Sequence, residues 1–225
     1  QIVNKIHGSL TGLAPAQIRG IEQLYRRRVP PERIVSHELA RQLTAISREI
    51  NRQIGILITR RGEIAFVIVG SHKDILIPGL NSYRTFSTRF KGLRLVHTHL
   101  DGEQLTTDDL TDLALLRLDL VCAITALPAG LPDKAYTAHL IPENQEGAYW
   151  MQLSPAPPSE LTLDFLSFIQ ALEGEFAKKQ KTRKVDATDR AILIRVENDP
   201  LAESGHALDE LNELARSCGV EVFDA

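Results

Sequence analysis

The sequence predicts an α/β fold in which a mixed β-sheet is flanked by helices. Short runs rich in β-branched residues, which favour strands, recur between residues 53 and 142. Before and between them lie segments whose apolar residues recur at intervals of three and four, as on one face of a helix. A chain of 225 residues, 43% of them hydrophobic, is also long enough to bury a substantial core.

Two amphipathic helices are predicted ahead of the first strand. In residues 14–28, Pro15 suits a first helical turn, and apolar residues follow at helical spacing. Ser36 is expected to cap a second helix that extends to about Asn51. Each helix has one apolar stripe, so both are expected to cover a sheet.

The predicted strands begin with an antiparallel hairpin, and one helix interrupts the later strands. The most apolar strand, at residues 92–100, is expected to be covered on both faces. The helix follows at residues 105–118, with Thr106 or Thr107 as its cap. Strands are predicted in QIGILIT (53–59), EIAFVIVG (63–70), DILIP (74–78), GLRLVHTHL (92–100), DLVCAITAL (119–127) and KAYTAHLIP (134–142).

The pattern divides the chain into a domain at residues 1–177, a linker at residues 178–188 and a second unit at residues 189–225. A helix at residues 159–177 is expected to complete the first domain, and the linker is basic and solvated. The second unit has the pattern of one parallel βαβ unit, which is not a stable domain by itself. We therefore expect the chain to end partway through its second domain. Pairing of two copies in a homodimer would cover the open edge.

The composition is that of an ordinary globular protein with a net charge of -3. Two cysteines do not make a disulfide framework, so the expected location is the cytoplasm. No run approaches the roughly 20 apolar residues that span a bilayer, and no membrane partner is expected. None of the 14 glycines is followed by lysine, as a phosphate-binding loop of the type G-x-x-x-x-G-K-[ST] requires. The chain therefore contains no GTP-binding motif of its own.

His97 and His99 are the strongest candidates for a metal site. They stand two residues apart on a predicted strand, so their side chains lie on the same face and can converge on one ion. Asp109, in the first turn of the next helix, offers a third ligand. A zinc ion held in this way keeps one position for a water molecule, whose pKa falls towards about 7. The alternative is a metal-free role, in which Asp109 interacts with the helix dipole and His97 is a hydrogen-bonded histidine.

These residues, together with the hairpin before them, resemble the JAB/MPN (JAMM) metalloprotease family and its RadC branch over residues 49–127. The family motif is H-x-H-P, a short loop and S-x-x-D. The resemblance implies a three-layer α/β body and a zinc hydrolase. Its ligands would be His97, His99 and Asp109, with Glu49 as the acid/base.

The sequence departs from the family motif at several positions. Leu100 replaces the proline, Thr106 replaces the serine, and the loop between the two half-motifs is one residue shorter. The positions aligned with the catalytic glutamate hold Asn51 and Arg52, and Glu49 is the nearest acid. A zinc hydrolase needs such a group to move a proton. Metal binding without proteolysis is therefore a separate alternative.

Residues 81–94 suggest an RNA-binding surface. Aromatic and basic side chains alternate there, as in proteins that stack bases and pair phosphates. The alternative is an ordinary solvated surface, since the total charge is negative. The candidate RNA or ribosome contacts are Arg84, Arg89, Lys91 and Arg94.

The C-terminal residues 189–225 resemble the opening βαβ unit of the N-terminal domain of HflX-type GTPases. Residues 12–29 resemble a helix of that domain, and residues 48–62 and 95–119 are similar to the N-terminal extension of some bacterial members. The resemblance implies a parent protein that binds and hydrolyses GTP with Mg²⁺ and acts on the large ribosomal subunit. Its GTPase motifs would follow Ala225. This chain is then an accessory or regulatory region and is not expected to be catalytic by itself.

Overall fold

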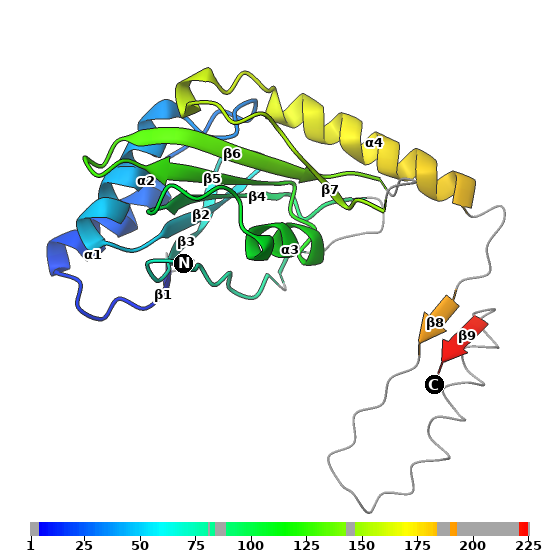
Figure 1. Cartoon of the computed structure of the whole chain (residues 1–225), viewed down its shortest axis with the longest axis horizontal. Coiled ribbons are helices and arrows are strands. Elements are labelled where there is room, and N and C mark those ends of the chain that lie inside the picture. Colours follow the sequence, from blue (N-terminus) through cyan, green and yellow to red (C-terminus); the bar gives the residue numbers. More distant parts are fainter. Residues whose placement is uncertain are drawn as a thin grey trace, which may run out of the picture. The chain divides into compact units, whose positions relative to one another are not determined.

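The computed structural model describes residues 5–80, 82–83, 89–142, 147–183, 190–192 and 221–224. The chain divides into two compact units, Gln1–Ala177 and Lys178–Ala225. The first contains a seven-stranded sheet in the order β1-β3-β2-β4-β5-β6-β7 (Figure 1). Its strands are β1 (Ile6–Gly8), β2 (Ile54–Thr59), β3 (Ile64–Val69), β4 (Leu93–His99), β5 (Leu120–Ala126), β6 (Pro132–Leu140) and β7 (Trp150–Gln152).

The sheet is mixed and has helices on both faces. The β1–β3 and β4–β5 pairs are parallel, and the other pairs, including the predicted β2–β3 hairpin, are antiparallel. The predicted α/β fold with a mixed sheet and flanking helices is thus confirmed. The helices are α1 (Pro15–Glu22), α2 (His37–Ile50), α3 (Thr107–Leu115) and α4 (Phe165–Arg183), with short 3₁₀ turns at Gln23–Arg26 and Pro158–Glu160.

Successive side chains of β4 point to opposite faces of the sheet, where they contact different helices. Thr98 Oγ1 donates a hydrogen bond to Ser47 Oγ of α2 (2.7 Å). On the other face, His97 and His99 approach Asp109 of α3. Because neighbouring residues of a strand point to opposite faces, α2 and α3 cover opposite sides of the sheet. Every residue of β4 is buried, as predicted for a strand covered on both faces, and every residue of β5 is buried as well.

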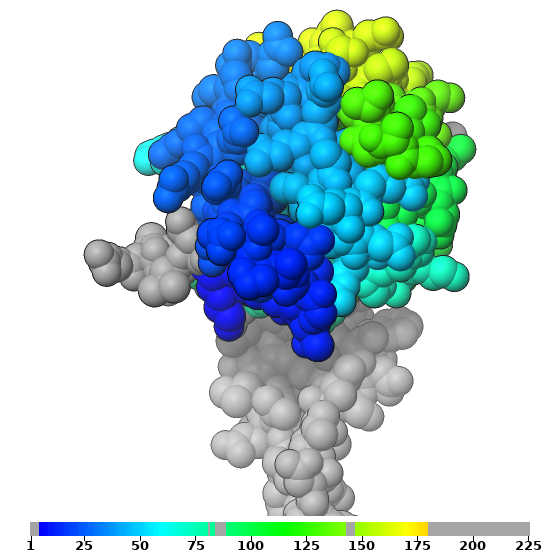
Figure 2. Space-filling view, turned by 90° about the vertical axis from the view of Figure 1, so that its left-hand side faces the viewer, coloured from blue at the N-terminus to red at the C-terminus, as the bar shows by residue number. Residues whose placement is uncertain are grey.

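The helix caps account for where α2 and α3 begin. Ser36 Oγ accepts a hydrogen bond from Leu39 N (3.2 Å), as predicted. At the other end, Asn51 adopts a left-handed conformation (φ 52°) and closes α2. Further contacts fix α2 to the sheet: Thr44 Oγ1 donates to Gly130 O (2.9 Å) in the β5–β6 turn. Figure 2 shows this side of the molecule, where light-blue residues of the α2 region lie beside the green patch that follows them in the colour scale.

Three sequence predictions differ from the structure. Residues 74–78 are not a strand; they belong to a segment that runs over the sheet. The predicted linker is helical at its start, because α4 continues to Arg183. That helix also begins later than predicted, at Phe165, since the residues before it form a 3₁₀ turn and an extended segment. The short edge strands β1 and β7 were not predicted.

Beyond the end of α4, the described part of the second unit is a pair of parallel strands, β8 (Arg190–Ile192) and β9 (Glu221–Asp224). The helix predicted between them, at about residues 201–217, lies outside the described residues. Among the helices that the structure describes, none combines the length and apolar character needed to cross a membrane.

Candidate metal centre

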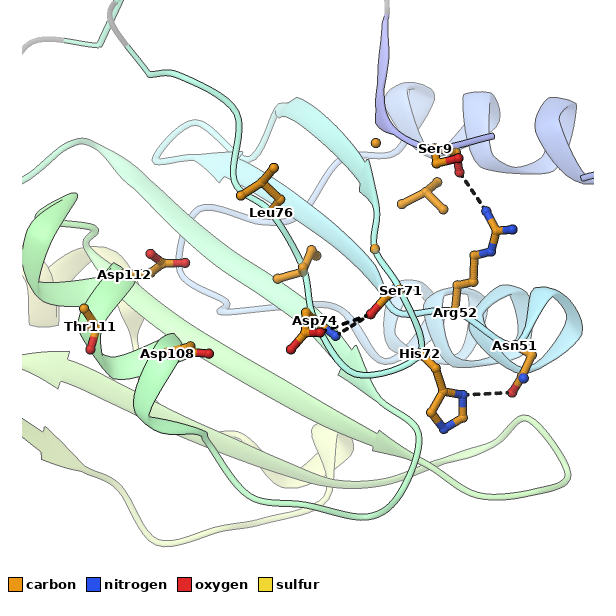
Figure 3. A pocket seen from close by; sticks show the side chains of 14 residues that line it. Ser9, Asn51, Arg52, Ser71, His72, Asp74, Leu76, Asp108, Thr111 and Asp112 are labelled. Atoms are coloured by element: carbon orange, nitrogen blue, oxygen red, sulfur yellow. Dashed lines mark hydrogen bonds between the residues drawn. The ribbon is translucent and has the colours of Figure 1, made fainter. Parts of the chain in front are cut away.

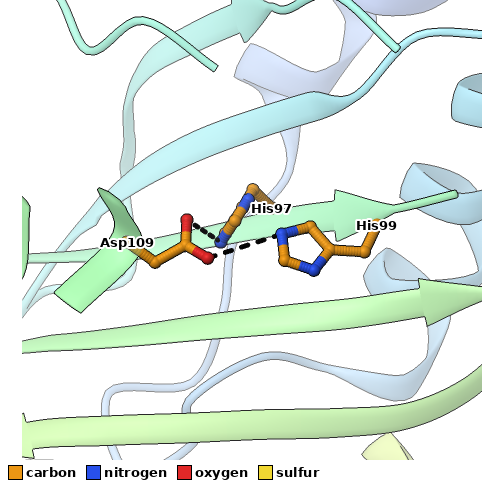
Figure 4. A group of neighbouring side chains, drawn as sticks. All are labelled: His97, His99 and Asp109. Atoms are coloured by element: carbon orange, nitrogen blue, oxygen red, sulfur yellow. Dashed lines mark ion pairs between the residues drawn. The ribbon is translucent and has the colours of Figure 1, made fainter. Parts of the chain in front are cut away.

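The two histidines and the aspartate predicted from the sequence meet at one point between β4 and α3 (Figure 4). His97 Nε2 lies 3.3 Å from Asp109 Oδ1, and His99 Nε2 lies 3.5 Å from Asp109 Oδ2. One ligand atom from each residue lies within 4.8 Å of the others. The three residues are 0%, 1% and 7% exposed. The cluster is therefore buried and compact.

The spacing of these atoms matches that of a tetrahedral zinc site. Zinc bonds to nitrogen and oxygen of about 2.0–2.1 Å place neighbouring ligand atoms roughly 3.3 Å apart. The distances from Asp109 Oδ1 to His97 Nε2 and from Asp109 Oδ2 to His99 Nε2 are close to this value, although they involve the two different carboxylate oxygens. A single ion therefore fits with small side-chain movements.

Small neighbours leave room for the imidazole of His97. In the sheet, His97 pairs with Gly55 of β2 on one side and with Ala123 of β5 on the other. Residues paired across neighbouring strands point to the same face, so larger side chains at these positions would compete with His97 for space. This arrangement comes from three different strands, and the spacing of the histidines alone does not predict it.

The start of α3 holds the carboxylate of Asp109 in place. Thr106 caps the helix, because its Oγ1 accepts a hydrogen bond from Asp109 N (3.2 Å). In return, Asp109 Oδ2 accepts hydrogen bonds from Thr106 N (2.7 Å) and Thr106 Oγ1 (2.8 Å). This reciprocal capping box anchors one carboxylate oxygen. The other oxygen, Oδ1, is left facing His97.

His99 presents a lone pair to the centre, and His97 is uncharged. His99 Nδ1 lies 3.0 Å from the backbone carbonyl oxygen of Glu103, which can only accept, so we assign the hydrogen to Nδ1 and the lone pair to Nε2. Burial lowers the pKa of His97 to about 4, and His99 adds to this shift while Asp109 opposes it. His97 is thus neutral at pH 7, as a metal ligand must be.

Glu49 does not join the cluster. It is exposed on α2, whereas Ser47 and Ile50 face the core. Two residues along a helix correspond to a rotation of roughly 200°, so Glu49 points away from the side on which Ser47 contacts β4. In addition, α2 covers the face of the sheet opposite the cluster. The predicted acid/base role of Glu49 is therefore wrong.

The predicted RNA contacts do not form one surface. Arg94 is fully buried: its guanidinium donates to Ile34 O and Thr59 O, both at 2.8 Å, and stacks over the ring of Phe165. Its assignment as an RNA contact is wrong, because a strand covered on both faces has no solvent-facing side. Arg89 is exposed and Lys91 is partly buried. Arg84 lies outside the described residues.

A pocket of about 870 Å³ lies beside the cluster and was not predicted (Figure 3). Its wall includes His72, whose Nδ1 lies 3.1 Å from Asn51 Oδ1 and whose Nε2 lies 3.0 Å from Asp101 Oδ1. The carboxylate of Asp101 has a lowered pKa, chiefly because of its hydrogen bond to His72. These partners are 21 and 29 residues away along the chain, so sequence spacing gave no signal for them.

No protein-family model matches the chain, and no curated protein matches it. The resemblances to the JAMM and HflX families therefore stay predictions, and the function is argued from the site.

Proposed function

We propose that this domain binds a zinc ion through His97, His99 and Asp109. The observation that carries the proposal is the lack of hydrogen-bond partners for the ring nitrogens of His97. Both of its ring nitrogens are buried without a hydrogen-bond partner, although Asp109 Oδ1 lies 3.3 Å from Nε2. A buried polar group left unpaired costs about 1–3 kcal/mol, so such groups in a folded protein call for an explanation. A bound cation accounts both for the unpaired nitrogen of His97 and for the carboxylate that faces it.

Zinc suits this set of ligands better than magnesium or calcium. Both of those ions take oxygen ligands, whereas two imidazole nitrogens and one carboxylate are common around zinc. Two of the ligand side chains also have hydrogen-bond partners that orient them: the Glu103 carbonyl orients His99, and Thr106 orients Asp109. Such partners fix ligand geometry and strengthen metal binding.

The ion would join β4 to α3 and so stabilise the fold. Three protein ligands leave one coordination position open, which is the feature that favours the alternative of a zinc hydrolase. A hydrolase also needs a proton-transfer group. Among the residues that the structure describes, the only carboxylate in the cluster belongs to Asp109 itself. We therefore assign metal binding to the domain and no hydrolytic reaction.

Metal content tests this assignment. The protein purified without chelators is expected to carry about one zinc per chain, and His97→Ala should carry less than about 0.1 because three ligands are needed to hold the ion. Elemental analysis by mass spectrometry measures both. The matched control is His37→Ala, an exposed histidine on α2, which should keep the wild-type content. Wild-type protein without zinc, even after incubation with excess metal, would refute the proposal.

We further propose that this chain is an accessory region of an HflX-type GTP-binding protein that acts on the ribosome. The parallel pairing of β8 with β9 supports it, since a βαβ unit has this pairing. GTP and Mg²⁺ would bind to a separate GTPase domain. Cosedimentation of the chain with large ribosomal subunits is the test, and binding should weaken as salt rises if phosphate contacts contribute. Absence of cosedimentation at low salt would count against this assignment.

A further inference from the structure

The pocket beside the cluster lies between α3 and the segment that follows β3. We call residues 70–76 the strap. In Figure 3 the strap runs between Asp108, Thr111 and Asp112 of α3 on one side and Ser9, Asn51 and Arg52 on the other, and all of these residues line the pocket. Asp108 and Asp112 stand on either side of the ligand Asp109 in the sequence. The pocket and the metal centre therefore share a helix.

Ile75 lies between the pocket and Gly55, the residue that pairs with His97 in the sheet. Its side chain fills the space above Gly55: a Cβ at Gly55 would lie 2.1 Å from Ile75 Cδ1 and 3.5 Å from His97 Cβ. Ile75 is also part of the pocket wall. One aliphatic side chain thus contacts the pocket on one side and covers the strand position beside His97 on the other.

Hydrogen bonds hold the backbone at the start of the strap, whereas only the side chain of Ile75 packs over Gly55. Gln53 N donates to Ser71 O (2.8 Å), and Gln53 Nε2 donates to Lys73 O (2.7 Å). Ser71 N donates to Asp74 O (2.8 Å), which closes a turn just before Ile75. The next residue, Leu76, is 85% exposed. Ile75 can therefore change rotamer without disrupting the backbone hydrogen bonds of the strap.

The pocket has an excess of carboxylates. Asp74, Asp108 and Asp112 line it. The guanidinium of Arg52, also in the wall, donates to the backbone oxygens of Ser9 and Thr11, both at 2.8 Å, and His72 is paired with Asp101. The three carboxylates outnumber the one guanidinium, and a concave surface with a net negative charge raises the local concentration of cations. This surface favours small cations.

We propose that the pocket is the route by which a hydrated divalent cation reaches His97, His99 and Asp109, and that the Ile75 side chain is its gate. The proposal rests on the proposed zinc binding. The ligands are at most 7% exposed, so an ion cannot reach them unless some covering group moves. The carboxylates of Asp74, Asp108 and Asp112 concentrate the cation in the pocket. Movement of the Ile75 side chain then lets the cation pass from the pocket to the ligands.

The rate of zinc release tests the gate. Zinc-loaded protein is mixed with an excess of a coloured zinc chelator, and release is followed by stopped-flow absorbance. Ile75→Ala should release zinc at least about tenfold faster, because the wild type must first move a partly buried aliphatic side chain. Ile75→Val, which keeps most of the packing, should give a smaller increase. The matched control is Leu115→Ala, an aliphatic residue of α3 that is 77% exposed and should release zinc at the wild-type rate.

The rate of zinc uptake tests the carboxylates. In Asp108→Asn/Asp112→Asn, metal-free protein should take up zinc about threefold to tenfold more slowly at low salt, and the difference should shrink as salt screens the charges. Zinc content at saturation should be unchanged, since neither residue is a ligand.

The outcomes separate the two proposals. If the wild type binds no zinc, the proposed function fails and the route fails with it. If the wild type binds zinc but both Ile75 variants release it at the wild-type rate, the metal centre stands and the gate is wrong. Circular dichroism and zinc content at saturation establish that each variant is folded and loaded before its rate is measured.

Discussion

Removing zinc with a chelator should lower the melting temperature of the protein by roughly 8–16 °C. An ion that binds only the folded state and is present at about 1,000 times its dissociation constant stabilises by about 4 kcal/mol. For a chain of this size, each kcal/mol corresponds to a shift of about 2–4 °C. The physical cause is the link between β4 and α3 that His97, His99 and Asp109 make through the ion. Thermal unfolding with and without chelator measures the shift.

Two variants serve as controls for the effect of the chelator. His97→Ala should melt at the same temperature with and without chelator, because it has already lost the site. His37→Ala should show the full wild-type shift, since this histidine is exposed on α2. If wild-type protein that demonstrably carries zinc melts at an unchanged temperature after chelation, then the ion does not link the two elements.

The second large effect is expected at Arg60, which joins the β2–β3 turn to two other parts of the fold. Its Nε lies 2.6 Å from Asp119 Oδ2, and its Nη2 lies 2.8 Å from Glu173 Oε1 of α4. The Asp119 side chain is fully buried. Arg60→Met leaves that carboxylate in the core without its cation, and breaking a buried pair in this way costs about 3–5 kcal/mol. Denaturant unfolding should show a loss near the lower limit, because Arg60 is partly exposed.

The loss at Arg60→Met should depend on pH in a defined direction. Burial raises the pKa of Asp119, and the bonds to Arg60 oppose that shift. Without Arg60 the folded-state pKa rises further above the unfolded value, so folding takes up a proton and stability falls as pH rises through this window. The deficit should therefore be larger at pH 8 than at pH 5. The matched control is Arg61→Met, which is exposed and should change stability by less than about 0.5 kcal/mol at either pH. An equal loss in both variants would contradict this role of Arg60.

The metal ligands could be predicted from the sequence because each depends on a local rule. Side chains two residues apart on a strand share a face, so His97 and His99 had to converge if GLRLVHTHL was a strand. Thr106 and Asp109 have the spacing of a helix cap and its third residue, which places Asp109 at the start of α3. The strand and the helix are adjacent in the sequence. A short connection therefore brings the three side chains together.

The other features of the site depend on contacts between distant segments, and no local pattern predicts those. The apolar run DILIP has the composition of a strand, but its Ile75 packs on Gly55 of β2 from a segment that is not a strand. Glu49 is the acid nearest in sequence to the aligned positions Asn51 and Arg52, but the helical rotation of α2 turns it to solvent. Arg94 was grouped with exposed basic residues, although its strand is buried on both faces. Its two carbonyl partners belong to Ile34 and Thr59, which are 60 and 35 residues away.

Anomalous X-ray diffraction at the zinc absorption edge tests the central claim most directly. Crystals of protein purified without chelators are expected to show one strong peak in the first unit, about 2.0–2.2 Å from His97 Nε2, His99 Nε2 and one carboxylate oxygen of Asp109. The peak should disappear in crystals of His97→Ala. A zinc-soaked crystal with no anomalous density between β4 and α3, or with Nε2 of His97 bonded to a protein group or water in place of an ion, would contradict the account.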